Sequence, residues 1–452
     1  MHNFKKCRLA LLGCIAFLLV NGILSFCLTP ITYSRFLKRD LKKMERAGEG
    51  IDLLFIGSSR VYRTYIPSVF EEAIDGIDCV INAGTSAQPL MGTYYYLKHM
   101  LNRYTPEKVM LGIDYTSYMK SEERWRLQAR MIIDERLPWG EEKLEYFKKA
   151  FYPDEYIYFW DIYKNRDRVT DTIDKAADFI GENIRIKLGK EYWNNIDIRE
   201  TEHYAEKGFV YTSTGLIEGN VEIPDITPIW AEDNVDETCL EYLYKIVDLC
   251  KEKNVALYMA AAPTSLTAIY YNPGYGAADR FFSEYAESEG IPYVNLNLLR
   301  NRWEIIPDSF MYDWNHVNGE GAERISRIYA DILQRQMNGE DISEYVYDSV
   351  EQMQENILFV AGATLQIDVD DEGLMTATAD SMYTKGKVVP EYRFLVSRDF
   401  GEHWSILQDY SESPVCTLQT EEGGRYRIRV QVRACGSNAE YEAFQEKPYP
   451  VF

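Results

Sequence analysis

The sequence has few of the residues that metal and redox centres use. It contains five histidines and eight cysteines, and neither a Cys-x-x-Cys pair nor a His-Glu-x-x-His motif occurs. Cys239 and Cys250 fall on one predicted helix, roughly 16 Å apart, which is too far for a disulfide. Cys416 and Cys435 are the one pair suited to bonding. We therefore expect no metal, no cofactor and no disulfide scaffold.

Positive charge is also scarce. The chain has 49 lysines and arginines against 71 acidic residues, which gives a net charge of −22. Such a chain repels nucleic acid and anionic membrane surfaces, so its charge argues against both as partners. The charge also disfavours a polyanionic substrate, unless a local basic pocket overrides the overall field.

One long hydrophobic run is present, at the N-terminus. It extends from Leu9 to Leu28, is uncharged, and is interrupted only by Asn21 and Ser25. Twenty apolar residues can span a bilayer. Three basic residues precede the run, which predicts a cytoplasmic N-terminus and extracytoplasmic main domains. No small-x-small cleavage site closes the run, so we expect 1–31 to be an uncleaved transmembrane anchor rather than a signal peptide.

The next apolar segment predicts a central strand followed by a tight turn. Ile51 to Ile56 reads as a strand buried on both faces, and Gly57-Ser58-Ser59 follows it directly. A helix is predicted only after Pro67. This arrangement puts the Ser59 hydroxyl at the carboxyl end of a strand, where open α/β sheets keep their active sites. The alternative is that Ser58 and Ser59 only cap the next helix.

Four more strands alternating with helices indicate a parallel sheet with right-handed crossovers. We place them in an α/β domain of residues 32–340, which begins with a helix from Arg35 to Ala47. The expected strands are Cys79 to Asn82, Lys108 to Ile113, Val255 to Ala261 and Pro292 to Leu296.

The pattern is interrupted by an insertion at about 121–230. This segment is polar, aromatic and helical in character, with Trp125, Trp139, Trp160 and Trp193 along it and no clean strand. It is either a lid or substrate platform over the open end of the sheet, or a packing appendage.

A second chemical signal is Asp313-Trp314-Asn315-His316. Asp313 comes three residues before His316, so a single turn can place its carboxylate on the imidazole. That contact would fix the tautomer and stabilise the imidazolium that forms when His316 takes a serine proton. The alternative is an Asx-turn with a surface histidine.

The two motifs together resemble those of the SGNH (GDSL-type) hydrolase superfamily. Gly57-Ser58-Ser59 stands where that superfamily has Gly-Asp-Ser, and Asp313 to His316 matches its Asp-x-x-His. The resemblance covers roughly Ile51 to Gln336, apart from the insertion. It implies a flavodoxin-like parallel sheet and a triad in which Ser59 is the nucleophile, His316 the base and Asp313 the residue that orients it.

The N-terminal anchor and the Gly-Ser-Ser-Arg variant are most similar to anchored members linked to O-acylation of extracellular glycans. Those members are the alginate O-acetyltransferase proteins and the D-alanyl transfer protein of lipoteichoic acid synthesis. The resemblance implies a glycan acceptor, an acyl donor and a membrane-bound O-acyltransferase as partner.

The oxyanion donors depart from the superfamily pattern. The superfamily usually has a glycine after the second strand, and Ala87 occupies that position here. The backbone N–H of Ala87 can still act as an oxyanion donor, together with the backbone N–H of Ser59. The superfamily's usual asparagine after the third strand falls on Asp114 or Thr116. A carboxylate cannot stabilise an oxyanion, so the side-chain donor is Thr116 or comes from elsewhere; the other candidates are Arg60 and Arg63. Losing one donor typically lowers the rate by ~10²–10³.

The C-terminal part is predicted to be separate. Residues 341–357 form an acidic, amphipathic linker helix. Residues 358–452 contain short alternating strands separated by turn signals such as Asp370 to Gly373 and Gly423-Gly424, as in a fibronectin- or immunoglobulin-like β-sandwich. We expect this domain to contact carbohydrate or protein.

Three hypotheses for the function follow. The first is an anchored extracytoplasmic serine enzyme that transfers an acyl group, such as acetyl, to a cell-surface or exported glycan. The second is a carbohydrate esterase that uses the same residues. The third is a non-catalytic glycan-binding or assembly protein that retains the fold.

Overall fold

The computed structural model describes residues 2–30, 32–120, 123–166, 173–189, 197–224, 227–421 and 424–450. Its centre is a five-stranded parallel sheet with strand order β2-β1-β3-β7-β8. This confirms the α/β class and the five expected strands. Their bounds are β1 Leu53–Ile56, β2 Val80–Asn82, β3 Lys108–Ile113, β7 Ala256–Ala261 and β8 Tyr293–Asn295.

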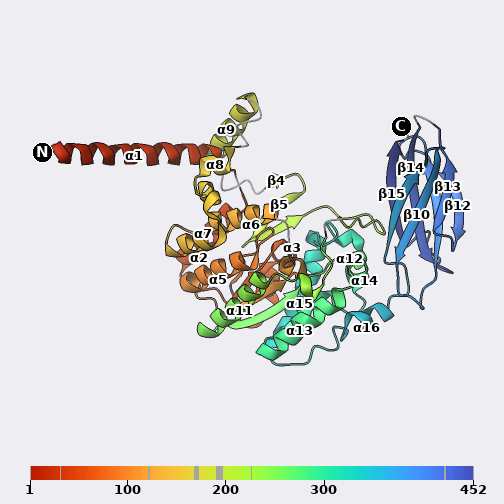
Figure 1. Cartoon of the computed structure of the whole chain (residues 1–452). Coiled ribbons are helices and arrows are strands. Elements are labelled where there is room, and N and C mark those ends of the chain that lie inside the picture. Colours follow the sequence, from red (N-terminus) through yellow and green to blue (C-terminus); the bar gives the residue numbers. More distant parts are fainter. Residues whose placement is uncertain are drawn as a thin grey trace.

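The central strand β1 is apolar throughout because helices cover both faces of the sheet. Leu54 and Ile56 pack on one side against α5 (Leu90–Tyr104), α11 (Glu237–Glu252) and α13 (Tyr275–Glu289). Leu53 and Phe55 point to the other side, which α3 (Ser59–Thr64), α4 (Pro67–Ala73) and α15 (Gly319–Met337) cover. Alternate residues of a strand point to opposite faces, so four consecutive apolar residues are what a doubly covered strand needs. Figure 1 shows these helices gathered around the sheet.

The N-terminal helix α1 (His2–Leu28) projects away from this body, and the β-sandwich lies at the opposite end of the molecule (Figure 1). Its segment Cys7–Leu28 is 22 residues long and almost entirely outside the protein core. Length and composition therefore fit either a membrane span or a signal sequence. The predicted helix that follows it is also present, as α2 (Ser34–Ala47).

The insertion is mainly helical, as expected, but the prediction that it lacks strands is wrong. Its helices include α6 (Glu123–Arg136), α7 (Glu141–Ala150), α8 (Asp161–Lys164) and α9 (Ile173–Leu188), with the 3₁₀ segment η2 (Pro153–Phe159) between α7 and α8. It also contains a three-stranded antiparallel sheet of β4 (Asp197–Arg199), β5 (Glu202–Glu206) and β6 (Phe209–Thr212).

The β5–β6 hairpin forms because its turn is held against the central sheet. Lys207 and Gly208 have φ of 40° and 99°, and the Lys207 carbonyl accepts the backbone N–H of Asn82 at 2.8 Å. A Cβ on Gly208 would lie 1.7 Å from the Asn82 carbonyl oxygen, so only glycine fits this close approach.

The linker is not the continuous helix that we predicted for 341–357. Only Val350–Glu355 is helical, as α16. The preceding backbone pairs instead with the segment after β8: Tyr345 accepts the N–H of Arg300 at 2.9 Å, and Tyr347 donates to Leu298 at 2.8 Å. These bonds use backbone N–H and C=O groups that would otherwise form the internal hydrogen bonds of a helix.

The C-terminal domain consists of two antiparallel sheets, β13-β10-β9 and β12-β11-β14-β15, with one hydrophobic core between them. This confirms the expected sandwich. Cys416 and Cys435 are both free thiols. The strands are β9 Gly362–Val369, β10 Leu374–Met382, β11 Pro390–Ser397, β12 Ser405–Ser411, β13 Val415–Gln419, β14 Arg425–Ala434 and β15 Ala443–Pro450.

Candidate active site

The turn after β1 presents Ser59 at the carboxyl edge of the sheet. Gly57 has φ of 150°, and a Cβ there would lie 2.7 Å from the Cγ2 atom of Val61, so the turn requires glycine. A short helix that the sequence did not predict, α3, begins at Ser59. Ser58 is its N-cap and accepts the N–H of Arg60 at 3.3 Å. The capping alternative therefore holds for Ser58, while the hydroxyl of Ser59 faces elsewhere.

The structure brings Ser59, His316 and Asp313 together. Ser59 Oγ lies 2.8 Å from His316 Nε2, and His316 Nδ1 lies 2.9 Å from each carboxylate oxygen of Asp313. If Nδ1–H donates to the carboxylate, Nε2 is left as an acceptor for the serine proton. The arrangement can therefore activate the Ser59 hydroxyl as a nucleophile.

Asp313 also shapes the loop that carries His316. One of its carboxylate oxygens accepts the backbone N–H groups of Asn315 and His316, each at 2.9 Å. The Asx-turn alternative is thus real, but it coexists with the contact to Ser59. Burial alone would raise the pKa of Asp313, but hydrogen bonds from the imidazole and from these N–H groups hold the pKa below its usual value. The carboxylate stays ionised and can stabilise an imidazolium.

A buried network holds this loop to the rest of the sheet. The Trp314 carbonyl accepts the Thr264 hydroxyl at 2.7 Å and the Ser265 N–H at 2.8 Å. Thr264 is itself fixed, because its N–H donates to the side chain of Asn297 at 2.8 Å and its carbonyl accepts the buried guanidinium of Arg302. Thr264 follows β7, so the sheet itself sets the position of His316.

The residue expected to replace the oxyanion asparagine is part of a buried ion pair. Asp114 lies 3.3 Å from the guanidinium of Arg60, and both side chains are at most one-tenth exposed. Asp114 also accepts the Ser58 hydroxyl at 3.4 Å, and the N–H and hydroxyl of Thr116 at 3.2 and 2.8 Å. Asp114 therefore closes a turn and neutralises Arg60.

These contacts remove two of the predicted oxyanion donors. Arg60 donates to Asp114 and to the Ala262 carbonyl. Arg63 donates to Thr212 at 2.6 Å and to Glu202 at 2.8 Å. The suggestion that either guanidinium serves the site is wrong, because buried polar partners already hold both. Thr116 remains beside the site, although its hydroxyl donates to Asp114 here.

Two backbone donors remain available. The N–H groups of Ser59 and Ala87 have no acceptor within the described part of the chain. The loop that carries Ala87 runs beside the Ser59 turn, because Thr85 donates to the Gly57 carbonyl at 3.0 Å. Ala87 has φ of 47°, an uncommon conformation for a residue with a side chain.

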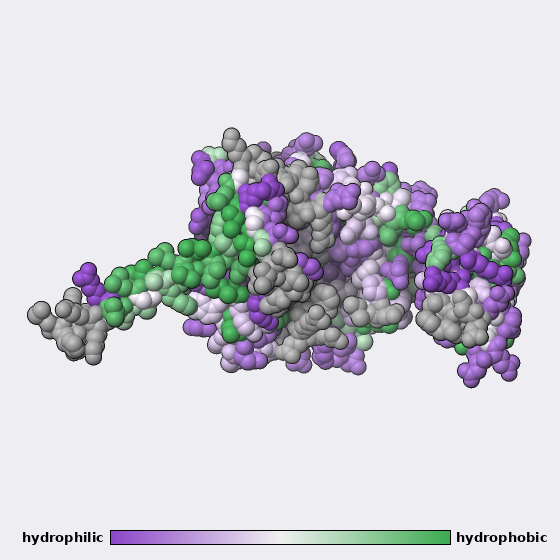
Figure 2. Space-filling view, turned by 90° about the horizontal axis from the view of Figure 1, so that it is seen from above, coloured by the Kyte–Doolittle hydropathy of each residue, from purple (hydrophilic) through white to green (hydrophobic). Residues whose placement is uncertain are grey.

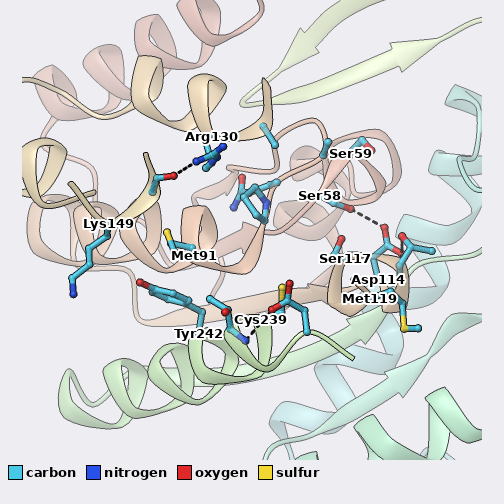
Figure 3. A pocket seen from close by; sticks show the side chains of 18 of the residues that line it. Ser58, Ser59, Met91, Asp114, Ser117, Met119, Arg130, Lys149, Cys239 and Tyr242 are labelled. Atoms are coloured by element: carbon cyan, nitrogen blue, oxygen red, sulfur yellow. Dashed lines mark hydrogen bonds between the residues drawn. The ribbon is translucent and has the colours of Figure 1, made fainter. Parts of the chain in front are cut away.

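A cavity of about 660 Å³ opens beside Ser59. Ser59, Ala87, Thr116 and Asn315 are among its lining residues. The Asn315 amide was not anticipated as a donor, although it is one of the variable residues of the Asp-x-x-His motif. Figure 3 shows Met91 and Tyr242 between the serines and Lys149, which lies at the far end. The cavity is therefore polar at Ser59, has both apolar side chains and the guanidinium of Arg130 further along, and has Lys149 at its far end.

The insertion forms one wall of this cavity. Ala129, Arg130, Lys149, Ala150 and Tyr152 contribute to the lining, so the insertion does lie over the carboxyl edge of the sheet. Tyr152 is an aromatic residue of the insertion that lines the cavity, whereas the tryptophans of the insertion whose side chains the structure describes do not line it. Trp139 and Trp160 lie at a separate cavity, and Trp193 is outside the described residues.

Comparisons with solved structures give matches at low sequence identity and low TM-score. No family model matches the chain, and no curated protein matches it. A GDSL-like lipase from Bacteroides thetaiotaomicron is 10% identical, with a TM-score of 0.30, covering 67% of this chain and 99% of its own. A putative acylhydrolase from Bacteroides fragilis is 10% identical, with a TM-score of 0.31, covering 68% and 98%. The esterase EstA from Pseudoalteromonas sp. is 12% identical, with a TM-score of 0.29, covering 64% and 99%.

Proposed function

We propose that this protein is a serine acyl-ester enzyme with Ser59 as its nucleophile. The observation that carries the proposal is the 2.8 Å contact between Ser59 Oγ and His316 Nε2, with Asp313 on the opposite ring nitrogen. His316 takes the hydroxyl proton as Ser59 attacks the acyl carbonyl. The donor's alcohol leaves with that proton, and an acyl-serine remains. An acceptor hydroxyl then gives its proton to His316, takes the acyl group and regenerates Ser59.

The backbone N–H groups of Ser59 and Ala87 are the proposed oxyanion donors. Both lie at the cavity end where the acyl carbonyl must sit, and neither has another acceptor among the described residues. We add Asn315 to Thr116 as a candidate for the side-chain donor. An amide N–H₂ is a stronger candidate than a hydroxyl that already donates to Asp114.

We propose an extracytoplasmic glycan as the acyl acceptor. The sequence resemblance to anchored O-acylation proteins supports this, as does a cavity wide enough for a sugar beside the acyl group. In this proposal α1 is a single-pass anchor with a cytoplasmic N-terminus, and a membrane-bound O-acyltransferase supplies the acyl group. The β-sandwich, at the far end from α1, would then reach away from the membrane (Figure 1).

A serine-reactive fluorophosphonate tests the nucleophile directly. The full chain in detergent should be labelled once, at Ser59, as shown by peptide mass spectrometry. Ser117→Ala is the matched control, because Ser117 lines the same cavity without contacting His316. Labelling at another serine would show that the nucleophile is wrong, and no labelling above background in the folded protein would support the non-catalytic glycan-binding hypothesis instead.

The same reagent tests the positioning role of Thr264. Thr264→Val keeps the shape of the side chain but removes the hydroxyl that holds the Trp314 carbonyl. We expect the labelling rate to fall about fivefold, since a lost hydrogen bond costs about 1 kcal/mol. Thr264→Ser keeps the donor and should restore the rate. Equal rates in the valine and serine variants would show that this contact does not position His316.

Transfer and hydrolysis differ in what accepts the acyl group. The purified protein should be given an acyl ester with and without an oligosaccharide acceptor, and the products separated by mass spectrometry. The glycan proposal predicts acylated oligosaccharide in excess over free acid. Free acid alone, at a rate that does not respond to the oligosaccharide, would identify an esterase.

A further inference from the structure

A second cavity lies at the foot of the apolar helix. Its volume is about 680 Å³, and it is enclosed by the C-terminal end of α1, the start of α2, the α6–α7 region, α8 and α9. It is separate from the Ser59 cavity, and no residue lines both. Ring contact between Phe17 and Trp160, with centroids 5.3 Å apart, holds the insertion against α1.

The polar residues of the apolar run face this cavity. Asn21 and Ser25, the two interruptions noted in the sequence, line it together with Thr29. Residues four apart lie on one face of a helix, so the three form a stripe. Ser25 donates to the carboxylate of Asp161. The buried Asn21 Oδ1 and Thr29 Oγ1 atoms have no hydrogen-bond partner among the described residues. Buried polar atoms normally have one.

The cavity has an excess of positive charge in a strongly acidic protein. It is lined by five cationic side chains, Arg35, Lys38, Lys143, Lys164 and Lys187, and by three carboxylates, Asp134, Glu135 and Asp161. Lys143 and Lys164 pair with Asp134 at 3.1 and 2.8 Å. The lining of this cavity is therefore net positive, although the whole chain has a net charge of −22.

In the described part of the chain, two of these lysines have backbone carbonyl oxygens as their hydrogen-bond partners. Lys38 donates to the Glu135 carbonyl at 3.1 Å, and Lys187 to the carbonyls of Phe26 and Thr29 at 2.5 and 2.6 Å. Neither forms an ion pair with a described residue. Burial, with Lys143 and Arg136 nearby, lowers the pKa of Lys38, and burial lowers the pKa of Lys187. An anion between them would offset the cost of burying these charges.

We propose that this cavity binds the phosphate and hydroxyl groups of an anionic lipid headgroup. Lys38 and Lys187 would hold the phosphate, and headgroup hydroxyls would complete the hydrogen bonding of Asn21 and Thr29. The inference rests on the proposed membrane position of α1, whose C-terminal end would lie at the level of the headgroups. The hydrophobic surface of α1 continues onto the adjoining face of the body (Figure 2). Trp139, 70% exposed, and Trp160 line the cavity and suit such an interface.

Native mass spectrometry of the full chain in detergent tests this site. Phosphatidylglycerol carries both a phosphate and free hydroxyls, and phosphatidylcholine with the same acyl chains has no net charge and no headgroup hydroxyl. We expect one phosphatidylglycerol molecule to be retained at least about tenfold more tightly than phosphatidylcholine. Equal retention of the two lipids would overturn the proposal. So would sodium phosphate binding as tightly as the lipid, since a free phosphate site would then explain the cavity.

Four sets of variants distinguish lipid binding in this cavity from a general effect of the protein's charge. Lys38→Gln with Lys187→Gln should abolish most of the preference for phosphatidylglycerol. Lys385→Gln with Lys447→Gln changes the net charge equally at exposed positions of the β-sandwich and should have no effect.

Asn21→Leu removes a polar group from an apolar helix, so this variant should fold and still lose part of the preference for phosphatidylglycerol. An unchanged preference in Asn21→Leu and in the Lys38 and Lys187 double variant would place the lipid elsewhere. Ser59→Ala should bind lipid like the wild type, which keeps this test independent of the proposed enzyme activity.

Discussion

Replacing Ser59 with alanine is expected to abolish acyl chemistry while the fold stays intact. Among the described residues, the Ser59 hydroxyl is the nucleophile that contacts His316 Nε2, so the rate of acyl transfer should fall by about 10⁴ or more. Only one partly exposed oxygen is lost, and the free energy of unfolding should change by no more than about 0.5 kcal/mol. The measurement is acyl transfer by the purified full chain, paired with its thermal unfolding.

His316→Ala should cost a similar factor, and the double variant with Ser59→Ala should be little worse than either single one. This follows because the serine is reactive only while the imidazole takes its proton, so the two act as a unit. Asp313→Asn should cost less than either, since the Asx-turn can still form around an amide. Ser117→Ala is the control within the cavity and should keep wild-type activity. Unchanged acyl transfer in Ser59→Ala would show that the nucleophile is wrong and favour a scaffold.

The sequence was sufficient to predict that Ser59 and His316 meet. Each motif can be recognised locally, and the parallel sheet brings the two motifs to the same edge. The turn at Gly57 places one side chain at the end of β1, and the Asp313 turn shapes the loop of the other. In a parallel sheet the carboxyl ends of the strands share one edge. Ser59 and His316 are 257 positions apart in the chain, and they therefore meet although no sequence motif contains both residues.

The elements that were missed have weak local patterns. Helix α3 is six residues long and has no apolar period, so nothing in Ser59–Thr64 distinguishes it from a loop. The β5 strand carries charged residues, and one of them, Glu202, is buried and pairs with Arg63 at 2.8 Å. The 341–357 segment has helical periodicity, but the backbone of Leu298 and Arg300 competes for its hydrogen bonds. For β5 and for the 341–357 segment, a tertiary contact overrides the local preference.

The role of Asp114 could not be read from the sequence for the same reason. A carboxylate after β3 and an arginine after Ser59 each look like surface residues, and 54 positions separate them. Only the order β1 next to β3 brings them together. Once paired, they explain why a carboxylate occurs where an oxyanion donor was expected: it balances the buried guanidinium directly behind the nucleophile.

Arg60→Ala is accordingly expected to destabilise the α/β domain by about 3–5 kcal/mol. Removing one partner of a buried ion pair leaves the other charge uncompensated. The side chains of Arg60 and Asp114 are only 5% and 10% exposed, so water cannot take the place of the guanidinium. The loss is measured by urea unfolding of the full chain, with hydrogen exchange of the β1 and β3 amides reporting this domain alone.

The matched control is Arg280→Ala, which breaks the exposed pair with Glu351, whose side chains are 56% and 58% exposed. That change should cost no more than about 1 kcal/mol. Combining Arg60→Met with Asp114→Asn removes both charges, fills the guanidinium's space with apolar atoms and keeps an acceptor for Thr116. The combined variant should regain much of the stability that Arg60→Ala loses, because the uncompensated charge is gone. If it is less stable than Arg60→Ala, the destabilisation comes from lost packing around Arg60, and Asp114 does not depend on the guanidinium for its place behind Ser59.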